Sequence, residues 1–566
     1  MRKKYLIVGG NAGGLSCATR LRRLDEFAEI IIFEKTDYIA YSTCSLPYHL
    51  SKAIPHFEEL ILMTPERFKK QYNVDVRTNH EVISVNPKEK VILVQDHIHK
   101  KVYEENYDYL ILAPGANAIE PEIPGKEKLP YFMIRNIIDL SRLLDFINEK
   151  EVHHLTVVGG GFIGIEVVEA LKTRGIDVTL VESQKHVLNL FDFEMAQIIH
   201  KVLLDNNVSL YVNTMVKEIV DGSLILDNGD TINTDGVVFA IGIRPATEFL
   251  RNTGIALDNR GYIIVNGFYQ TSDSNIFAIG DAIKVRYALT NLYEPLPLAS
   301  TAVKQARLVA DYLNGLDVVN SGFIGTNVIK IFDYTASVTG ITENYIKKRQ
   351  LDYQYNVIYL APSDRVSIIP CANIVFMKVI YEKQSGKLLG AQAIGKGLVE
   401  KRIDVLSVAI KLGATVRDLQ NLELGYAPFY GTAKDPVNIA GYIGANLNQE
   451  RYKQIIFTKV RDLVTSNAQI IDVREKHEFE KGHIISARNI PLSELRERIA
   501  EIDKSKPVYV HCRTGARSYS ACLILRQYGF DAINIAGGYL FLSYYEDTLR
   551  RLDNNYQVII TNPNFH

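Results

Sequence analysis

Two glycine-rich turns, each lying between an apolar run and a helical pattern, constrain the fold of this chain most. The first, Gly9-Gly10-Asn11-Ala12-Gly13-Gly14, follows the apolar run Lys4–Val8. A second apolar run, Ile30–Phe33, ends at Glu34. This order is typical of a dinucleotide-binding unit, in which backbone N–H groups hold a pyrophosphate and the acid holds a ribose. Asn11 replaces one glycine of the usual pattern, so a plain turn stays open as an alternative. The predicted contacts are Gly9, Gly13, Gly14 and Glu34.

The second turn, Gly159-Gly160-Gly161-Phe162-Ile163-Gly164, has the complete G-x-G-x-x-G spacing. It follows the apolar run Leu155–Val158, and Glu182 ends the next one. A carboxylate at that position accepts hydrogen bonds from a ribose 2′-hydroxyl and repels a 2′-phosphate. The sequence therefore favours NADH over NADPH, although Lys185 and His186 nearby weaken that preference. The predicted contacts are Gly159, Gly161, Gly164 and Glu182.

The length of 566 residues predicts several domains. A net charge of -1 gives no electrostatic reason to expect nucleic acid or an anionic membrane as a partner. No apolar run approaches the ~18 residues that span a bilayer, so we expect a cytoplasmic protein. The five cysteines are scattered and form no C-x-x-C pair, so we expect no metal site.

Two further segments connect the first turn to a known family. Leu110–Ala116 contains Gly115, and Thr271–Ala282 contains Gly280 followed by Asp281. With the first turn, these segments resemble the three FAD-contacting segments of the pyridine nucleotide–disulfide oxidoreductases. The resemblance implies bound FAD, with Asp281 bonding the ribitol chain. It also implies an NADH domain inserted into the FAD domain.

A single cysteine, Cys44, lies in the segment Tyr38–Tyr48. Classical family members carry two cysteines there, in C-x-x-x-x-C. This segment and Leu424–Asn438 resemble the coenzyme A–disulfide reductases, across essentially residues 1–445. The resemblance implies that Cys44 forms a mixed disulfide with coenzyme A in a homodimer. It also implies that Tyr426, with Tyr430 nearby, helps protonate the leaving thiolate from the other subunit; packing is the alternative role for both tyrosines.

The chain departs from that family at two places. Thr43 precedes the cysteine where the family has Asn, and Ile368-Ile369-Pro370-Cys371-Ala372 replaces Tyr-Tyr-Pro-Gly-Ala. The second departure removes one expected tyrosine, so the proton donor stays open. We expect Cys371 to lie in the core, with a second redox thiol as the alternative. The predicted coenzyme A contacts, of which the first two match the family's basic residues, are Arg20, Arg23, Thr43 and Arg67.

The C-terminal part resembles a rhodanese domain along its full length. The matching segments are Ile470–Glu475, Gly482–Ile484 and the loop from Cys512 to Arg517. A strand-to-helix loop with a Cys-x4-Arg pattern offers backbone N–H groups and a cation to a thiolate or persulfide. Phosphatases use Cys-x5-Arg, and the shorter loop suits a sulfur atom better. We predict Cys512 and Arg517 as catalytic and Cys522 as a core residue.

The predicted fold is α/β: two Rossmann-like nucleotide-binding domains, an α+β dimerisation domain and a C-terminal α/β rhodanese domain. The predicted function is NADH-dependent reduction of coenzyme A persulfide, polysulfide or coenzyme A disulfide, or of other small persulfides, by a flavoprotein. The alternatives are an NADH oxidase or peroxidase with one cysteine, and a sulfurtransferase or sulfur sensor. The predicted domains are FAD-binding 1–115 and 245–322, NADH-binding 116–244, dimerisation 323–445, linker 446–454 and rhodanese 455–566.

Overall fold

The computed structural model describes residues 2–564. Residue 1 of the predicted FAD domain and residues 565–566 of the predicted rhodanese domain therefore lie outside the described part. The chain folds into two compact units, and each is described by itself. The first comprises Met1–Gly159, Val167–Asp177 and Val216–Phe323, and the second comprises Gly160–Glu166, Val178–Met215 and Ile324–His566.

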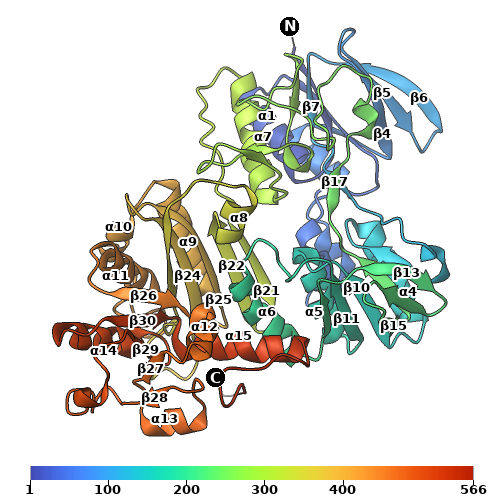
Figure 1. Ribbon diagram of the computed structural model, residues 1–566. Coiled ribbons are helices and arrows are strands. Elements are labelled where there is room, and N and C mark those ends of the chain that lie inside the picture. Colours follow the sequence, from blue (N-terminus) through green and yellow to red (C-terminus); the bar gives the residue numbers. More distant parts are fainter. Residues whose placement is uncertain (1, 565–566) are drawn as a thin grey trace. The chain divides into compact units, whose positions relative to one another are not determined.

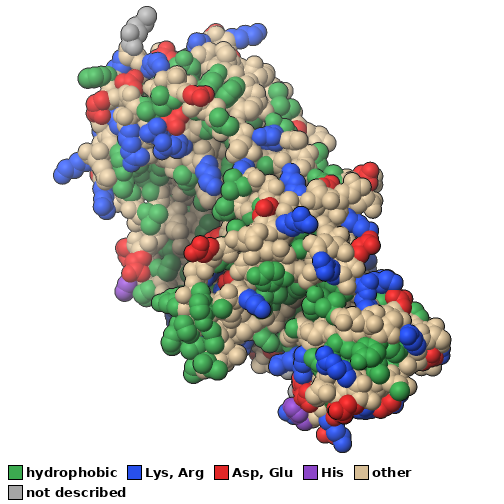
Figure 2. Space-filling view, turned by 90° about the vertical axis from the view of Figure 1, so that its left-hand side faces the viewer, with side chains coloured by type: hydrophobic (Ala, Val, Ile, Leu, Met, Phe, Trp, Pro, Cys, Tyr) green, Lys and Arg blue, Asp and Glu red, His purple; other side chains and the backbone are tan. Residues whose placement is uncertain are grey.

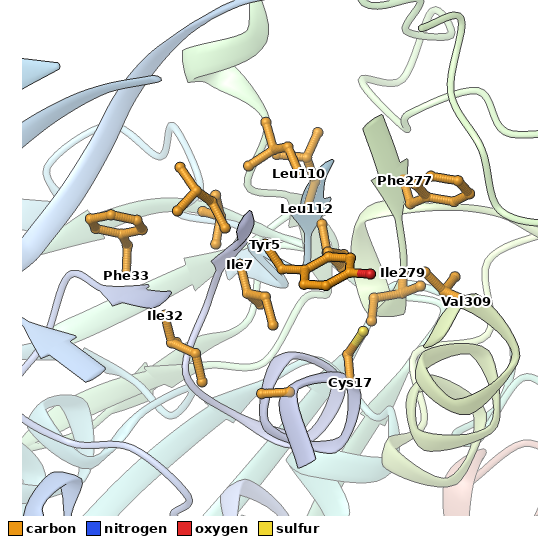
Figure 3. Packing of buried hydrophobic residues seen from close by; sticks show 14 of the residues in the cluster. Tyr5, Ile7, Cys17, Ile32, Phe33, Leu110, Leu112, Phe277, Ile279 and Val309 are labelled. Carbon is orange, nitrogen blue, oxygen red and sulfur yellow. The ribbon is translucent and has the colours of Figure 1, made fainter. Parts of the chain in front are cut away.

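Five parallel strands form the central sheet of the first unit, in the order β18-β7-β1-β2-β3. Helix α1 (Ala12–Leu24) packs against α7 (Ala299–Leu313). Four of the five strands are apolar along most of their length because helices and loops cover the sheet, whereas β3 reads Asp-Val-Arg-Thr and is only partly buried. Figure 3 shows residues that pack there. The strands are β1 (Lys4–Val8), β2 (Glu29–Glu34), β3 (Asp75–Thr78), β7 (Tyr109–Leu112) and β18 (Ile276–Ala278).

The rest of the first unit includes two antiparallel sheets and three paired parallel strands. One antiparallel sheet comprises β4 (His80–Asn86), β5 (Val91–Asp96) and β6 (Lys101–Asn106). The other comprises β13 (Val216–Val220), β14 (Ser223–Leu226) and β15 (Thr231–Asn233). The parallel strands are β9 (Tyr131–Met133), β10 (His154–Val158) and β16 (Gly236–Phe239).

The second unit contains an antiparallel sheet in the order β21-β22-β25-β24-β23. Its two central-most apolar strands, β24 and β25, are almost wholly buried. Strand β11 (Asp177–Glu182) pairs in parallel with β12 (Ser209–Val212), and α6 (Phe193–Asp205) lies between them in the chain. The sheet and its helices are β21 (Asn327–Ile331), β22 (Tyr334–Gly340), β23 (Tyr355–Leu360), β24 (Val375–Glu382), β25 (Leu388–Gly395), α8 (Glu343–Lys348), α9 (Val399–Lys411), α10 (Val416–Gln420) and α11 (Pro436–Asn448).

A buried ammonium joins α6 to this sheet. Lys378 is 0% exposed and its Nζ lies 2.7 Å from Asp192, 2.5 Å from Glu194 and 2.5 Å from Glu343. Within the described residues, these three acids are the one group with the spacing of a metal site. The ammonium takes the position that a cation would need, which explains how three carboxylates come to lie together.

The C-terminal part of the second unit is a five-stranded parallel sheet, in the order β26-β30-β29-β27-β28, with helices beside it (Figure 1). Helix α11 ends at Asn448 and β26 begins at Lys453, so residues 449–452 are the part of the predicted linker 446–454 that lies outside helix and strand, and Tyr452 among them is buried. The elements are β26 (Lys453–Ile456), β27 (Gln469–Asp472), β28 (Arg488–Asn489), β29 (Val508–His511), β30 (Ala532–Ala536), α12 (Val460–Thr465), α13 (Lys476–Lys481), α14 (Ala516–Gln527) and α15 (Gly538–Leu552).

This C-terminal part is fixed to the rest of the second unit by buried contacts. Helix α15 lies beside α6 in Figure 1, where Lys201 Nζ is 3.1 Å from Asp547 and Thr548 Oγ1 donates to the Gln197 carbonyl. On the antiparallel sheet, the Tyr359 ring of β23 packs edge-on against Phe457. Such contacts hold the loop from Cys512 to Arg517 (the sulfur loop) at a defined place relative to the antiparallel sheet.

The surface agrees with the near-zero net charge. Figure 2 shows Lys, Arg, Asp and Glu side chains mixed over the face in view, with hydrophobic side chains between them. Among residues 2–564, no helix combines the length and the apolar character that crossing a membrane would require.

Candidate functional site

The first glycine turn adopts the geometry that its sequence predicts. Gly9 has φ +105°, and a Cβ at this residue would lie 2.1 Å from the Ala113 carbonyl oxygen. A Cβ on Gly14 would lie 2.0 Å from the Gly9 carbonyl oxygen. Only glycine allows these close approaches, so the turn brings the N-terminus of α1 up against β1 and β7.

Glu34 lies at the end of β2, facing that turn. Its Oε2 accepts the Gly10 N–H at 2.9 Å, and its Oε1 accepts the Thr36 N–H at 3.0 Å. One carboxylate thus fixes the turn and the strand end together. Carboxylate oxygens accept several hydrogen bonds each, so a ribose contact remains compatible with this geometry.

The three segments predicted to contact FAD come together at one edge of the sheet. They follow β1, β7 and β18, which are adjacent strands. Gly115 and Gly280 both have positive φ, at +71° and +78°. Asp281 Oδ2 accepts a hydrogen bond from Arg135 Nη2 at 2.7 Å. Sequence reasoning missed Arg135, whose signal is its place just after β9.

Cys44 is exposed and lies in a short 3₁₀ helix, Thr43–Ser45. The Asn11 side chain donates a 3.1 Å hydrogen bond to Thr43 Oγ1, which ties this helix to the first glycine turn. The Ser42 and Ser45 hydroxyls are 2.6 Å apart. Asn11, the departure from the glycine pattern, therefore has a structural partner beside the cysteine.

The predicted coenzyme A contacts differ in their surroundings. Arg23 on α1 and Arg67 on α3 (Pro65–Tyr72) are exposed. Arg20 Nε is 2.6 Å from Asp311, so its charge is already paired. Arg22 is buried and donates to the Tyr72 and Asn73 carbonyls, which makes it part of the fold.

The second glycine turn repeats the pattern of the first. Gly159 has φ +109°, and a Cβ there would lie 2.5 Å from the Ala240 carbonyl oxygen. Glu182 Oε2 accepts the Gly160 N–H at 2.6 Å, as Glu34 accepts that of Gly10. A Cβ on Gly161 would meet open space, and Gly164 lies in α5 (Phe162–Thr173). The shared geometry explains why both turns need an acid at the following strand end.

Surface loops of the second unit contain the predicted catalytic residues Tyr426 and Tyr430. They also contain Cys371, for which a redox role was the alternative to a core position. Tyr426 and Tyr430, which precede α11, are exposed. The prediction that Cys371 lies in the core was wrong: its thiol is exposed and accepts a hydrogen bond from Arg365 Nη1 at 3.1 Å. Its apolar neighbours form a loop rather than a strand, and Ile368 is exposed as well.

Cys512 directly follows β29 and lies at the bottom of a tight loop. It is 1% exposed, and its Sγ accepts the Gly515 N–H at 3.2 Å and the Ser518 hydroxyl at 3.5 Å. Gly515 has φ +103°, which turns the loop so that α14 begins at Ala516 beside the sulfur. N–H and O–H donors with a helix N-terminus stabilise a thiolate. Cys522 is buried, as predicted.

Arg517 forms a two-pronged ion pair with Glu478 on α13. The two guanidinium nitrogens donate to the two carboxylate oxygens at 2.6 and 2.8 Å. These hydrogen bonds lower the pKa of Glu478 to about 2. The positive charge of Arg517 beside the sulfur loop is therefore balanced at all ordinary pH values.

A buried ion pair between Arg474 and Asp472 supports the sulfur loop. Arg474 donates to both oxygens of Asp472 and, at 2.7 Å, to the Gly482 carbonyl. Its guanidinium also lies over the Tyr539 ring. His511, between these residues and Cys512, is buried, and burial lowers its pKa. The Asp472-Val473-Arg474 pattern thus acts by positioning.

Models of three protein families match the chain. Residues 3–306 match the pyridine nucleotide-disulphide oxidoreductases, residues 326–434 match their dimerisation domain, and residues 457–540 match the rhodanese-like domain. The first match covers more than half of the chain. The protein belongs to the pyridine nucleotide-disulphide oxidoreductase family. The predicted fold class is thereby confirmed, and the family implies a flavin and a pyridine nucleotide.

Relatives and solved structures show which members of the family the chain resembles. A coenzyme A disulfide reductase from Staphylococcus epidermidis is 34% identical over 440 residues, covering 78% of this chain and 99% of the relative. The structure of reduced Bacillus anthracis CoADR-RHD is 40% identical, with TM-score 0.94, covering 97% of this chain and 99% of that one. A NAD-dependent persulfide reductase from A. fulgidus is 33% identical, with TM-score 0.89, covering 95% and 99%. The resemblance to a reductase fused to a rhodanese domain is therefore confirmed.

Proposed function

We propose that this protein is a cytoplasmic, homodimeric flavoenzyme that uses NADH to reduce coenzyme A persulfide, polysulfide or coenzyme A disulfide. The observation that carries the proposal is the exposed Cys44, tied by Thr43 and Asn11 to the glycine turn of a dinucleotide site. The similarity to a coenzyme A disulfide reductase and a persulfide reductase supports it.

The glycine turn at Gly9–Gly14, where an added Cβ would collide with backbone, fits the close approach of a dinucleotide. Glu34, Gly115, Gly280 and Asp281 line the same sheet edge and would hold FAD, which would supply two-electron transfer between the nicotinamide and Cys44. Gly159, Gly161, Gly164 and Glu182 would hold NADH, and the Glu182 charge disfavours the extra phosphate of NADPH.

The Cys44 thiolate then attacks the coenzyme A sulfur of the sulfur–sulfur bond. A mixed disulfide forms, and the second sulfur leaves with the electron pair as hydrosulfide or thiolate. Arg23 and Arg67 are exposed cations suited to the phosphates of coenzyme A, whereas Arg20 would first have to leave Asp311. Thr43 holds the cysteine loop in place, and Tyr426 or Tyr430 of the other subunit protonates the leaving group.

Cys512 has the second role. Its N–H cradle and the charge-balanced Arg517 suit a bound sulfane sulfur, which Cys512 carries as a persulfide and exchanges with coenzyme A. This step would generate the substrate that Cys44 reduces.

The test is NADH oxidation with coenzyme A persulfide, measured on the wild type and on Cys44→Ser. We expect the variant to lose at least about 1000-fold in turnover, because the attacking thiolate is absent. Sulfur transfer from thiosulfate to cyanide by Cys512 serves as the control and should persist. Unchanged NADH oxidation in Cys44→Ser would sink the proposal.

An NADH oxidase is the second candidate. Water-forming NADH oxidase from Lactobacillus brevis is 26% identical with TM-score 0.75, covering 79% of this chain and 99% of that one. Cys44, the one cysteine of its segment, could cycle through sulfenic acid. Oxygen consumption faster than persulfide reduction would favour this candidate.

A further inference from the structure

Two exposed loops of the second unit share one buried anchor, Arg402 on α9. Arg402 is 1% exposed, and its Nη2 donates to the Asp435 carboxylate at 2.9 Å and to the Asp364 carbonyl at 2.7 Å. Its Nη1 donates to the Leu398 carbonyl at 3.0 Å. A planar guanidinium can bridge partners on several sides at once, which the compact ammonium of a lysine does less well.

The first loop, residues 425–431 (the tyrosine loop), is closed at its base over this ion pair. Gly431 is buried, and a Cβ on it would lie 3.7 Å from Arg402 Nη2 and 3.8 Å from Asp435 Oδ2. The carbonyl oxygen of Gly425, at the other end of the loop, is 3.8 Å from the same point. Both ends of the tyrosine loop therefore meet beside the buried guanidinium.

The middle of the tyrosine loop is exposed and contains Tyr426 and Tyr430. Lys401, next to Arg402 on α9, donates from Nζ to the Tyr430 carbonyl at 3.1 Å. The start of α9 thus contacts the loop at its base and at one of its tyrosines. The two tyrosine side chains are held from below and remain open to a substrate.

The second loop, residues 364–373, is closed in a similar way. The Asp364 N–H donates to the Asn373 carbonyl at 2.8 Å, and the Asn373 N–H donates to Asp364 Oδ1 at 2.8 Å. Arg402 binds this base through the Asp364 carbonyl. The family resemblance would give each of the two loops a tyrosine, but this loop has Ile368 instead. Proton donation by tyrosine therefore depends on the tyrosine loop alone.

We propose that Arg402 is a positioning residue for the reduction, which fixes the bases of both loops so that a tyrosine hydroxyl meets the leaving sulfur. The inference rests on the proposed function, in which Tyr426 or Tyr430 protonates that group. A general acid acts only within hydrogen-bonding distance of the atom that it protonates, so a small displacement of the loop is costly. Asp435 shares this role as the partner of the guanidinium.

The proton transfer is balanced without a further reactant. The Cys44 thiolate attacks one sulfur of coenzyme A disulfide, the sulfur–sulfur bond breaks, and its electron pair goes to the departing sulfur. The tyrosine hydroxyl gives its proton to that sulfur, and water returns a proton to the tyrosine. Because Arg402 is buried, it acts by holding the loop and not by contact with the substrate.

The experiment measures NADH oxidation by full-length Arg402→Lys protein, with coenzyme A disulfide and with coenzyme A persulfide. The lysine keeps the positive charge but loses the planar fork. We expect kcat with the disulfide to fall about tenfold at unchanged KM, because a displaced tyrosine loses only an interaction of the transition state. The loss with the persulfide should be smaller, because hydrosulfide is a weaker base than the coenzyme A thiolate and leaves more readily without a proton.

A double-mutant cycle separates positioning from a general loss of structure. Replacing both tyrosines, Tyr426→Phe with Tyr430→Phe, removes the proton donors of the loop. Adding Arg402→Lys to that protein should lower kcat by less than about twofold further, because no donor remains to be displaced. Losses that multiply would assign Arg402 to the fold alone and would overturn the inference.

Arg417→Lys, which changes an exposed arginine on α10, is the matched control and should keep the wild-type kcat. Sulfur transfer from thiosulfate to cyanide by Cys512 should be equal in all of these proteins, which reports that the second unit is folded. Equal losses of kcat in Arg417→Lys and Arg402→Lys would count against the inference.

Should Arg402→Lys fail to fold, the partly exposed Lys401 provides a second test. Lys401→Gln releases the Tyr430 carbonyl and should lower kcat with the disulfide about fivefold, the worth of one hydrogen bond. Lys383→Gln, on the loop between β24 and β25, is its control. An unchanged kcat in Lys401→Gln would then overturn the inference.

The wild type separates the two possible failures. A wild type that oxidises no NADH with either substrate would refute the proposed function, and this inference with it. An active wild type whose losses multiply in the cycle would refute the role of Arg402 alone.

Discussion

The two sulfur sites of this protein are built in opposite ways. Cys44 is exposed on a short 3₁₀ helix that side-chain hydroxyl and amide groups hold in place. Cys512 is buried in a loop whose N–H and O–H donors point at the sulfur. An exposed thiol can meet a large substrate, whereas an enclosed one can protect a single transferable sulfur. The difference supports the proposed roles, which are reduction at Cys44 and storage at Cys512.

We expect the largest effect beneath Cys512, where a buried ion pair supports the loop. Arg474→Leu would leave the Asp472 carboxylate buried without its main partner. We expect the rhodanese domain to lose about 3–5 kcal/mol of its free energy of unfolding. Loss of thiosulfate–cyanide transfer with rising urea measures the change.

The control is Arg498→Leu, which removes a partly exposed arginine paired at the surface with Glu494 and Glu501 in the same domain. Exposed pairs contribute about 0–1 kcal/mol, so its transition should stay near that of the wild type. Equal shifts in the two variants would contradict a buried ionic support for the sulfur loop.

A smaller effect is expected from the ion pair beside Cys512. Glu478→Gln leaves Arg517 with an unbalanced charge, which would attract the dianion thiosulfate. We expect the kcat/KM for thiosulfate to rise about tenfold, the typical worth of one charge-assisted hydrogen bond. Transfer from an uncharged organic persulfide donor should change far less, and equal gains with both donors would refute this role for Glu478.

The ion pair between Arg517 and Glu478 also predicts how the wild-type activity depends on pH. In the wild type Glu478 has a pKa of about 2, so it is ionised and balances Arg517 throughout pH 5–8. Its contribution to stability is present above the unfolded pKa and is lost only as the pH falls toward 2. The ratio of thiosulfate to persulfide activity should therefore be flat over pH 5–8 in the wild type.

Local patterns made much of the fold predictable. Each glycine turn, its strand-end acid and the Cys512 loop lie within short stretches of sequence, where backbone geometry dictates residue type. The partners that complete the sites lie far away in the sequence. Arg135 reaches Asp281 from 146 residues away, and Lys378 reaches Glu194 from 184 residues away. No local periodicity encodes such pairs.

The wrong prediction that Cys371 is buried has a different cause. Its neighbours Ile368, Ile369 and Pro370 suggest a buried segment, yet the loop is exposed and the thiol meets Arg365. An apolar run predicts burial only when a strand or helix can place it on a covered face.

We expect the smallest effect at Cys44, whose loop is held by neutral hydrogen bonds and not, like the Cys512 loop, by ion pairs. Thr43→Val removes the hydroxyl that accepts from Asn11 and keeps the shape of the side chain. One such bond contributes about 1 kcal/mol, so we expect NADH-dependent persulfide reduction to fall about fivefold. Thr43→Ser keeps the acceptor and should restore the rate, whereas a slow Thr43→Ser variant would assign the loss to packing. Sulfur transfer by Cys512 should be equal in all three proteins, because Thr43 belongs to the other sulfur site.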